Sequence, residues 1–192
     1  MCGLAGYIGQ TKKPSDCLIK MIQAINHRGP DSNGIWTDQE GVGLAHARLS
    51  ILDLSTAGHQ PMHSVSGNYV LIFNGEIYNH KYLRSELESI SNRNWLGHSD
   101  TETLLASIEE WGIEDTLAKV KGMFAIALWD KKSKNLFLSC DRIGEKPLYY
   151  GWVNEQFVFA SELKSIKEFP TFNNEIDRNS LAMFLRFNSI PA

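Results

Sequence analysis

Short apolar runs separated by polar turns make up much of the chain and predict β-strands. Two of these runs, residues 69–73 and 123–129, are apolar at every position rather than at alternate positions. A strand with this pattern is buried on both of its faces. Further strands are predicted for residues 4–8, 42–46, 136–141, 148–152 and 157–160. The turns at residues 130–135 and 154–156 are short and polar, which favours antiparallel hairpins.

Apolar residues at helical spacing predict three helices in the first two thirds of the chain. The first has Ser15 or Asp16 as its predicted N-cap, the second begins after Asn79, and the third follows Ser99. Ser99 and Glu102 have the spacing of a capping box. The apolar faces of these helices are Leu18, Met21, Ile22 and Ile25; Leu83, Leu87 and Ile90; and Leu104, Leu105, Ile108 and Trp111.

Together these elements predict an α+β domain built in layers. Strands that are apolar on both faces need a cover on each side, which two antiparallel sheets packed together, with helices over their outer faces, would provide. Residues 27–34 are dense in turn residues and are predicted to form a loop, whereas residues 180–187 are predicted to form a last helix. The 192 residues contain no internal repeat or linker, so we interpret residues 1–192 as a single domain.

Charge and composition exclude several kinds of partner. The formal net charge is −3 and no cluster of Lys and Arg is present, so we expect no nucleic-acid partner. The longest apolar run, residues 123–129, is too short to span a membrane, and the N-terminus lacks the basic region of a signal peptide. The cysteines, Cys2, Cys17 and Cys140, form neither a disulfide framework nor a metal-ligand pattern. We therefore expect a cytoplasmic protein without a metal, and no pattern indicates an oligomeric state.

Cys2 is the first candidate for chemistry because of its position. If Met1 is removed, the α-amine of Cys2 becomes free, and such an amine titrates near a pKa of ~8. The amine can then act as the base for the thiol of the same residue, so no separate His is needed. With Met1 attached, the nitrogen is an amide and cannot take a proton. The alternative is that Cys2 is an inert, small apolar residue of the first strand.

Six blocks of sequence place Cys2 in a wider pattern. In chain order these are Met1-Cys2-Gly3-Leu4-Ala5-Gly6, His27-Arg28-Gly29-Pro30-Asp31, His46-Ala47-Arg48-Leu49-Ser50-Ile51-Leu52-Asp53, Asn74-Gly75-Glu76-Ile77-Tyr78-Asn79, Ser99-Asp100-Thr101-Glu102 and Asp141-Arg142-Ile143-Gly144-Glu145-Lys146-Pro147-Leu148-Tyr149-Tyr150. This series resembles the class II glutamine amidotransferase domain, specifically the N-terminal half of glutamine-dependent asparagine synthetases. The resemblance implies the N-terminal-nucleophile hydrolase fold, a four-layer αββα sandwich of two antiparallel sheets between helix layers.

The resemblance also implies the catalytic roles. Cys2 would attack the side-chain amide of L-glutamine and form a glutamyl thioester. The Asn74 side-chain amide and the Gly75 backbone N–H would form the oxyanion hole, where one donor is typically worth ~3 kcal/mol in the transition state. Gly75 also suits a close approach of the backbone to the substrate. From the residues alone, Asn-Gly after a strand is equally typical of a hairpin turn.

The remaining matched positions would bind the two charged groups of glutamine. Arg48 can bind the α-carboxylate through two parallel hydrogen bonds. The resemblance implies that the backbone of Leu49 and Ile51 lines the same pocket. Glu76 and Asp100 match the positions that bind the α-ammonium group. The alternatives are a surface ion pair for Arg48 and helix capping alone for Asp100.

Three other residues are interpreted as structural. Cys17 and Cys140 are expected to be buried thiols without a chemical role. His27 lies in a loop next to the candidate base, but the amine of Cys2 makes a second base unnecessary. We therefore expect His27 to hold the loop through a hydrogen bond.

The chain contains no glycine-rich loop that would bind ATP phosphates. The resemblance therefore implies that ATP and magnesium belong to a C-terminal synthetase domain of the full-length chain, which is the expected partner and which this sequence lacks. On this reading the chain is the glutamine-hydrolysing half of asparagine synthase and has no cofactor of its own. Two alternatives stay open: the same half of a relative that amidates another carboxylate, such as a sugar acid, and a non-catalytic docking domain.

Overall fold

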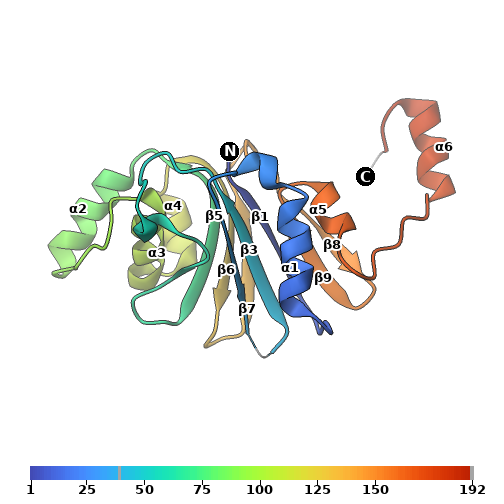
Figure 1. The fold of residues 1–192 in the computed structure, drawn as a ribbon. Coiled ribbons are helices and arrows are strands. Elements are labelled where there is room, and N and C mark those ends of the chain that lie inside the picture. The colour runs from blue at the N-terminus through green and yellow to red at the C-terminus, as the bar shows by residue number, and fades with distance from the viewer. Residues whose placement is uncertain (39, 191–192) are drawn as a thin grey trace.

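The computed structural model describes residues 1–38 and 40–190, and its centre is a pair of antiparallel sheets (Figure 1). The five-stranded sheet has the order β2 (Ser32–Thr37), β3 (Val42–Arg48), β1 (Gly3–Ile8), β9 (Gln156–Ala160) and β8 (Tyr149–Val153). The four-stranded sheet has the order β4 (Met62–His63), β5 (Tyr69–Ile77), β6 (Gly122–Asp130) and β7 (Asn135–Cys140). Every pair of neighbouring strands is antiparallel, as the short turns predicted.

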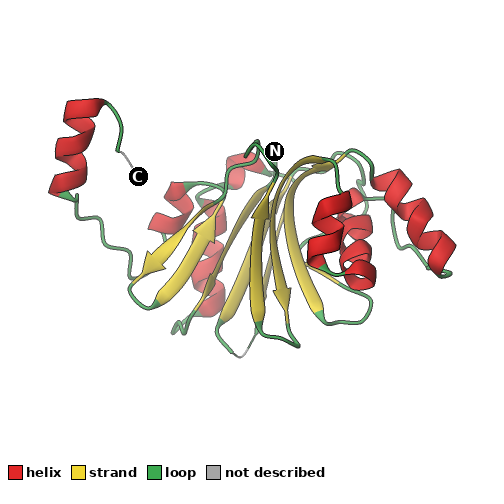
Figure 2. Ribbon diagram, turned by 180° about the vertical axis from the view of Figure 1, so that it is seen from behind, coloured by secondary structure: helices red, strands yellow, loops and turns green. Residues whose placement is uncertain are grey.

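Helices lie on the outer sides of both sheets (Figures 1 and 2). The five-stranded sheet is covered by α1 (Pro14–Gln23) and α5 (Leu163–Lys167). The four-stranded sheet is covered by α3 (Asp100–Trp111), and α2 (His80–Ile90) and α4 (Ile113–Lys119) pack against α3. Two 3₁₀ turns, η1 (Asn26–Arg28) and η2 (Thr56–Gly58), lie in loops. The last helix, α6 (Arg178–Phe187), stands away from the sandwich and has no buried residue.

The alternation of side chains along each strand divides the apolar residues among three cores. In β5, Val70 and Ile72 point into the core between the sheets, whereas Leu71 points outward to the helices of the four-stranded sheet. In β1, Leu4 likewise points between the sheets and Ala5 toward α1. This arrangement explains why the runs are apolar at every position, and it confirms the predicted four-layer αββα sandwich.

The predicted end of β5 at Phe73 is wrong, because the strand continues to Ile77. Asn74 and Gly75 pair with Ala125 and Phe124 of β6, and the register continues without a break as far as Gly122. The local turn preference of Asn-Gly is therefore overridden by the neighbouring strand. The oxyanion candidates lie inside a strand and form no hairpin turn.

The predicted loop at residues 27–34 is wrong from Ser32 onward, where the edge strand β2 begins. Ser32 pairs with Arg48, and the pairing continues to Thr37. Gly34 has no room for a side chain, since a Cβ atom there would lie 2.0 Å from the Gln60 carbonyl oxygen. The sequence patterns also failed to predict β4, α4 and α5, each of which has seven residues or fewer.

Some of the predicted N-caps and buried faces of the helices are wrong in detail. Helix α1 begins at Pro14 with Lys13 as its N-cap, and not after Ser15 or Asp16, because proline at the first helical position already fixes the required φ. Asn79 is the N-cap residue of α2, but its side chain instead bonds Lys119 and Lys121. Ile90, predicted on the buried face of α2, is 54% exposed.

Of the two hydrogen bonds in the predicted capping box, only the one to the Ser99 side chain forms at the start of α3. The Ser99 hydroxyl accepts a hydrogen bond from the Glu102 backbone N–H at 3.2 Å. The Glu102 carboxylate, however, accepts from the backbone N–H groups of Leu96 and Gly97 and not from that of Ser99. Ser99 therefore caps α3, while Glu102 holds the loop before it.

Within residues 1–38 and 40–190, no helix combines the length and apolar character needed to cross a bilayer.

Candidate active site

A cavity lies at the ends of β1 and β3 and beside β5, where the two sheets face each other. All eight residues predicted for the site line it: Cys2, Arg48, Leu49, Ile51, Asn74, Gly75, Glu76 and Asp100. These residues come from four separate parts of the chain, so the fold brings together what the sequence keeps apart. The contribution of each residue to chemistry depends on its local contacts.

Cys2 is held at both its side chain and its backbone. The thiol donates to the Leu49 carbonyl oxygen at 3.6 Å, and the Leu49 N–H lies 3.4 Å from the sulfur. The Cys2 carbonyl oxygen accepts a hydrogen bond from Arg28 Nε at 2.9 Å. Burial raises the pKa of the Cys2 thiol, and the hydrogen bond from Leu49 opposes that rise. The thiol therefore stays protonated at neutral pH and needs a base before it can act as a nucleophile.

Asn74 is positioned as an unsatisfied hydrogen-bond donor. Its side chain is buried, with the residue 1% exposed, and Nδ2 has no acceptor among the described residues. An unpaired donor in a buried site typically costs ~1–3 kcal/mol, which an incoming acceptor would offset. A negatively charged oxygen in the cavity would supply that acceptor.

The Gly75 N–H points away from β6. The N–H and C=O of its partner Phe124 are both bonded to Asp141, at 3.1 and 2.9 Å, so they face β7. In an antiparallel ladder the N–H of Gly75 must then point to the opposite edge of β5. Glycine is required at this position by packing, since a Cβ atom would lie 2.1 Å from the Met123 carbonyl oxygen. The close approach of β6 is thus a reason for glycine that the sequence did not reveal, whereas approach of a substrate to the Gly75 backbone stays a prediction.

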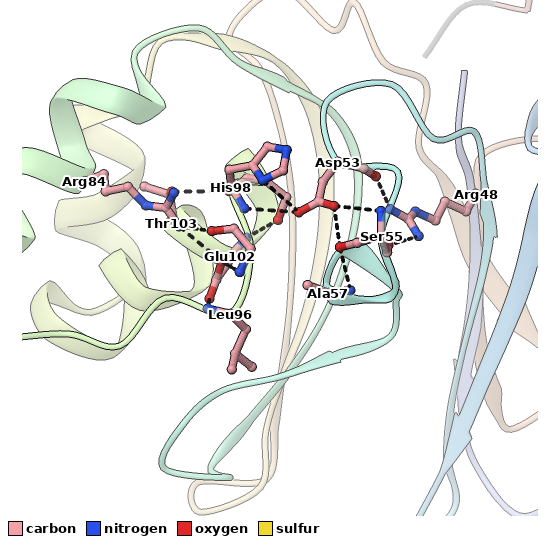
Figure 3. Close-up of polar contacts among 11 residues, drawn as sticks. Arg48, Asp53, Ser55, Ala57, Arg84, Leu96, His98, Glu102 and Thr103 are labelled. Atoms are coloured by element: carbon pink, nitrogen blue, oxygen red, sulfur yellow. Dashed lines mark hydrogen bonds and ion pairs between the residues drawn. The ribbon is translucent and has the colours of Figure 1, made fainter.

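Arg48 is 9% exposed and makes no ion pair with any residue that the structure describes, so the surface ion pair is not what holds it. Its Nη1 donates to the Ser55 carbonyl oxygen at 2.9 Å, and Nη2 donates to the Asp53 carbonyl oxygen (Figure 3). These two bonds fix the plane of the guanidinium group at the rim of the cavity. The group keeps further N–H donors for a ligand.

The loop that holds Arg48 is itself anchored by the Asp53 carboxylate (Figure 3). Asp53 accepts from the Ser55 hydroxyl at 2.6 Å and from the His98 N–H at 3.1 Å. The Ser55 hydroxyl makes the largest contribution to lowering the pKa of Asp53 to about 2. Asp53 therefore links the Arg48 loop to the segment before α3.

Asp100 and Glu76 provide two carboxylates to the lining of the cavity. Asp100 is the first residue of α3, but Ser99 caps the helix, so Asp100 is not needed as the cap. Its Oδ2 instead accepts from the Ile77 N–H at 2.9 Å. Burial raises the pKa of Asp100, against the effect of that bond, so a cation placed beside the carboxylate would be favourable. Glu76 is half-buried.

His46 and Gln60 support the site and were not identified from the sequence. His46 Nε2 bonds the Phe73 carbonyl oxygen at 3.0 Å, and Gln60 Oε1 accepts from the Phe73 N–H at 2.6 Å. Complete burial lowers the pKa of His46 to about 3, so the ring is neutral and Nε2 donates. The two side chains fix the peptide groups next to Asn74. Alternation along β3 could have placed His46 on the same face as Arg48.

The block that begins at Asp141 builds another wall. The Asp141 carboxylate accepts from the backbone N–H groups of Phe124, Ile143, Glu145 and Lys146. These bonds lower the pKa of Asp141 although its burial acts in the opposite direction. They bring the buried Lys146 to the cavity, where its Nζ lies 3.3 Å from the Met1 sulfur.

The other candidates lie outside the cavity. Cys17 is buried, as predicted, and burial raises its pKa to about 11. Cys140 is exposed, so its predicted burial is wrong; it ends β7, which is the edge strand of its sheet. His27 Nε2 lies 3.0 Å from Glu162 Oε1, which confirms its loop-holding bond. The described part of the chain holds no group of three His, Cys, Asp or Glu side chains suited to a metal ion.

Comparison with known proteins places this site in context. The sequence matches the family described as glutamine amidotransferase domain over residues 1–192. It is 40% identical to asparagine synthetase [glutamine-hydrolyzing] 1 of Bacillus subtilis, matching 100% of this chain but 30% of that protein. It is 36% identical to putative asparagine synthetase [glutamine-hydrolyzing] 2 of Methanocaldococcus jannaschii, matching 100% of this chain and 40% of that protein. The chain therefore spans less than half the length of these relatives.

More distant proteins share the sequence pattern or the fold. Amidase chry2 of Gibberella zeae is 34% identical over 88% of this chain and 27% of its own length. The solved structure of glutamine phosphoribosylpyrophosphate amidotransferase from B. subtilis, complexed with ADP and GMP, superposes with a TM-score of 0.76 at 21% identity. The superposition covers 92% of this chain and 45% of the amidotransferase. At that identity the likeness concerns the fold, which is that of the N-terminal-nucleophile hydrolases.

Proposed function

The chain belongs to the glutamine amidotransferase domain family, and from that membership we propose how the cavity around Cys2 hydrolyses L-glutamine to glutamate and ammonia. The observation that carries the proposal is that Cys2, Asn74 and Arg48 line one cavity although they are far apart in sequence. A nucleophile, an unsatisfied amide donor and a buried guanidinium are the groups that this hydrolysis requires. A docking domain would need none of them to converge.

The first half of the reaction forms a thioester. After removal of Met1, the neutral α-amine of Cys2 takes the thiol proton while the sulfur bonds the side-chain carbonyl carbon of glutamine. The carbonyl oxygen becomes negative and accepts hydrogen bonds from Asn74 Nδ2 and the Gly75 N–H. The protonated α-amine of Cys2 then returns the proton to the amide nitrogen of the substrate. That nitrogen departs as ammonia when the C–N bond breaks.

The second half regenerates the enzyme. Water attacks the thioester carbon, the same amine accepts a proton from the water, and the same two donors stabilise the oxyanion. The C–S bond breaks, the sulfur recovers a proton, and glutamate leaves. One terminal amine thus serves as base and acid in both halves, which fits a thiol whose pKa is raised by burial.

The ends of the substrate are bound by charge. The α-carboxylate bonds the free N–H groups of Arg48, whose plane the Asp53–Ser55 loop fixes. The backbone of Leu49 and Ile51 lines the same side of the cavity. The α-ammonium group lies against the carboxylates of Glu76 and Asp100. Because both charged groups must be recognised at once, the site favours a free amino acid over a peptide.

The identity of the ammonia acceptor is a separate proposal, suggested by the relatives that are named asparagine synthetases. We propose that ammonia passes to an ATP-dependent synthetase domain of the full-length chain, where ATP and magnesium would activate aspartate as in an asparagine synthase. Relatives with another printed name, the amidases chry2 and chyE, show that the sequence similarity extends beyond proteins named asparagine synthetase. The second candidate acceptor is therefore another carboxylate, such as a sugar acid. A reducing cytoplasm is the compartment that suits a free Cys2 thiol.

Cys2→Ala tests the glutaminase proposal. We expect the variant to lose ammonia release from glutamine while it binds glutamine with nearly unchanged affinity, since the sulfur forms bonds only during reaction. Ammonia release and calorimetric binding of glutamine are the measurements. Cys17→Ala is the matched control, because it removes a buried thiol outside the cavity and should retain hydrolysis. Near-normal turnover by Cys2→Ala would refute the assignment of the nucleophile.

A further inference from the structure

The end of β9 is tied to the start of β1 by a pair of hydrogen bonds. The Leu4 N–H donates to the Ser161 hydroxyl at 3.0 Å, and the Ser161 N–H donates to the Leu4 carbonyl oxygen at 2.8 Å. Ser161 is fully buried. Glu162 follows Ser161 directly and is therefore held beside Leu4, which lies in β1 two residues after Cys2.

The Glu162 carboxylate receives three donors. Arg28 Nη1 and His27 Nε2 each lie 3.0 Å from Oε1, and Lys164 Nζ lies 3.0 Å from Oε2. Burial acts to raise the pKa of Glu162, but the hydrogen bonds from Arg28, Lys164 and His27 lower it to about 2. The carboxylate is therefore charged at every pH at which the protein would work.

Arg28 connects this carboxylate to the nucleophile. The residue is 8% exposed, and its Nε donates to the Cys2 carbonyl oxygen at 2.9 Å. Because the guanidinium group is planar, a carboxylate that fixes Nη1 also fixes the direction of Nε. The backbone next to Arg28 is closely packed, since a Cβ atom at Gly29 would lie 2.3 Å from the Ala47 carbonyl group.

We propose that Glu162 is a positioning residue for the nucleophile, which holds Arg28 against the carbonyl group of Cys2 and so fixes the terminal residue in the cavity. The proposal rests on the glutaminase function and adds to it a residue that lies outside the cavity. Glu162 touches neither the sulfur nor the substrate pocket and acts only through Arg28. The contact matters because a terminal residue has chain on one side only, and small displacements of a nucleophile reduce turnover strongly.

Two substitutions at Glu162 and one control test the positioning role in protein freed of Met1. Glu162→Ala removes the contact, and we expect kcat for glutamine hydrolysis to fall about tenfold with KM nearly unchanged. Glu162→Gln keeps an acceptor oxygen for Arg28 without the charge, so its loss should be smaller. Lys164→Ala removes an exposed partner of the same carboxylate and should keep kcat within about twofold.

A double-substitution cycle separates action through Arg28 from a general loss of structure. Arg28→Lys should itself lower kcat, because lysine cannot bond Cys2 and Glu162 together. If Glu162 acts through Arg28, then Glu162→Ala should cost little more in the Arg28→Lys background than Arg28→Lys costs alone. Fully additive losses in kcat, or a loss confined to KM, would overturn the proposal.

Hydrogen exchange gives a readout that does not depend on hydrolysis. In Glu162→Ala, amide exchange should accelerate at Gly3 and Leu4 and stay unchanged in β5 and β6. Unchanged exchange at Gly3 and Leu4 would overturn the positioning role even if the wild-type chain proved inactive. Inactive wild-type protein would refute the glutaminase function instead, so the two failures are distinguishable.

Discussion

The thiol of Cys2 lies beside the backbone of Leu49, whose carbonyl oxygen accepts from it and whose N–H donates to it. Burial raises its pKa, so the surrounding protein does not stabilise a free thiolate. Asn74 contributes the complementary feature, a buried donor without an acceptor. At the scale of single residues, the site is therefore arranged for charge that appears during reaction and not for charge that is present beforehand.

Asn74→Ala should reduce turnover far more than stability. Loss of one oxyanion donor typically lowers kcat by ~10²–10³. The free energy of unfolding should stay within about 1 kcal/mol or rise slightly, because the donor removed is unsatisfied in the fold. Steady-state kinetics measure the change in kcat, and urea unfolding measures the change in stability. A variant with normal kcat, or one that is mainly destabilised, would show that Asn74 has a structural role.

The Asp53 carboxylate should make stability depend on pH. Its pKa is lowered to about 2 in the fold, against ~3.9 in an unfolded chain, so its contribution is complete above pH ~4 and is lost as pH falls toward 2. Asp53→Asn should therefore be less stable than wild type at pH 7, with the difference shrinking between pH 4 and 2. Urea unfolding of both proteins across this range checks the sign. A difference that is independent of pH would rule the carboxylate out as its source.

At the scale of elements, the hydrophobic pattern along the strands carried more information than local propensity. The two runs that are apolar at every position predicted the cover on both faces of β5 and β6, and the capping pattern at Ser99 predicted the start of α3. Turn propensity misplaced the end of β5, since pairing with β6 decides the conformation of Asn74 and Gly75. The edge strand β2 was missed for a similar reason, because its residues become a strand only beside β3.

Gly75→Ala should destabilise the fold, whereas Gly151→Ala should not. A Cβ atom at Gly75 would lie 2.1 Å from the Met123 carbonyl oxygen and 2.7 Å from Phe124 Cα, both of which belong to backbone that must move. Such overpacking typically costs ~1–3 kcal/mol. Gly151 has no atom within 4 Å of the added Cβ, and the change should stay within about 0.5 kcal/mol. Urea unfolding of both variants makes the comparison, and equal stabilities would contradict this packing.

At the scale of the whole molecule, the sandwich brings residues from both sheets to one cavity. Cys2 directly precedes β1 and Arg48 ends β3 of one sheet, and Asn74 lies in β5 of the other. The sequence motifs identified these residues through family resemblance, and their convergence in one cavity agrees with the roles it implied. Arg28, His46 and Gln60 were not assigned to the site from the sequence, because their contacts join residues that are 13 to 27 positions apart.

The last helix should contribute little to the stability of the sandwich. Helix α6 stands apart and has no buried residue, while Leu185 is 74% exposed (Figure 1). Residues 177–190 bury almost no apolar surface, so their deletion should change the unfolding midpoint by less than about 2 °C. Thermal unfolding checks this, and a large decrease would show that α6 packs on the sandwich in solution.

The central claim is that a freed terminal amine activates the sulfur next to it in a pocket for glutamine. Its most direct test is mass spectrometry of protein treated with a glutamine-like diazoketone, using the chain freed of Met1 and a chain in which one Ser precedes Cys2. We predict a single adduct on Cys2 in the first protein, prevented by excess glutamine, and none in the second, whose amine is blocked. Equal labelling of both proteins, or an adduct on Cys17 or Cys140 instead, would contradict the claim.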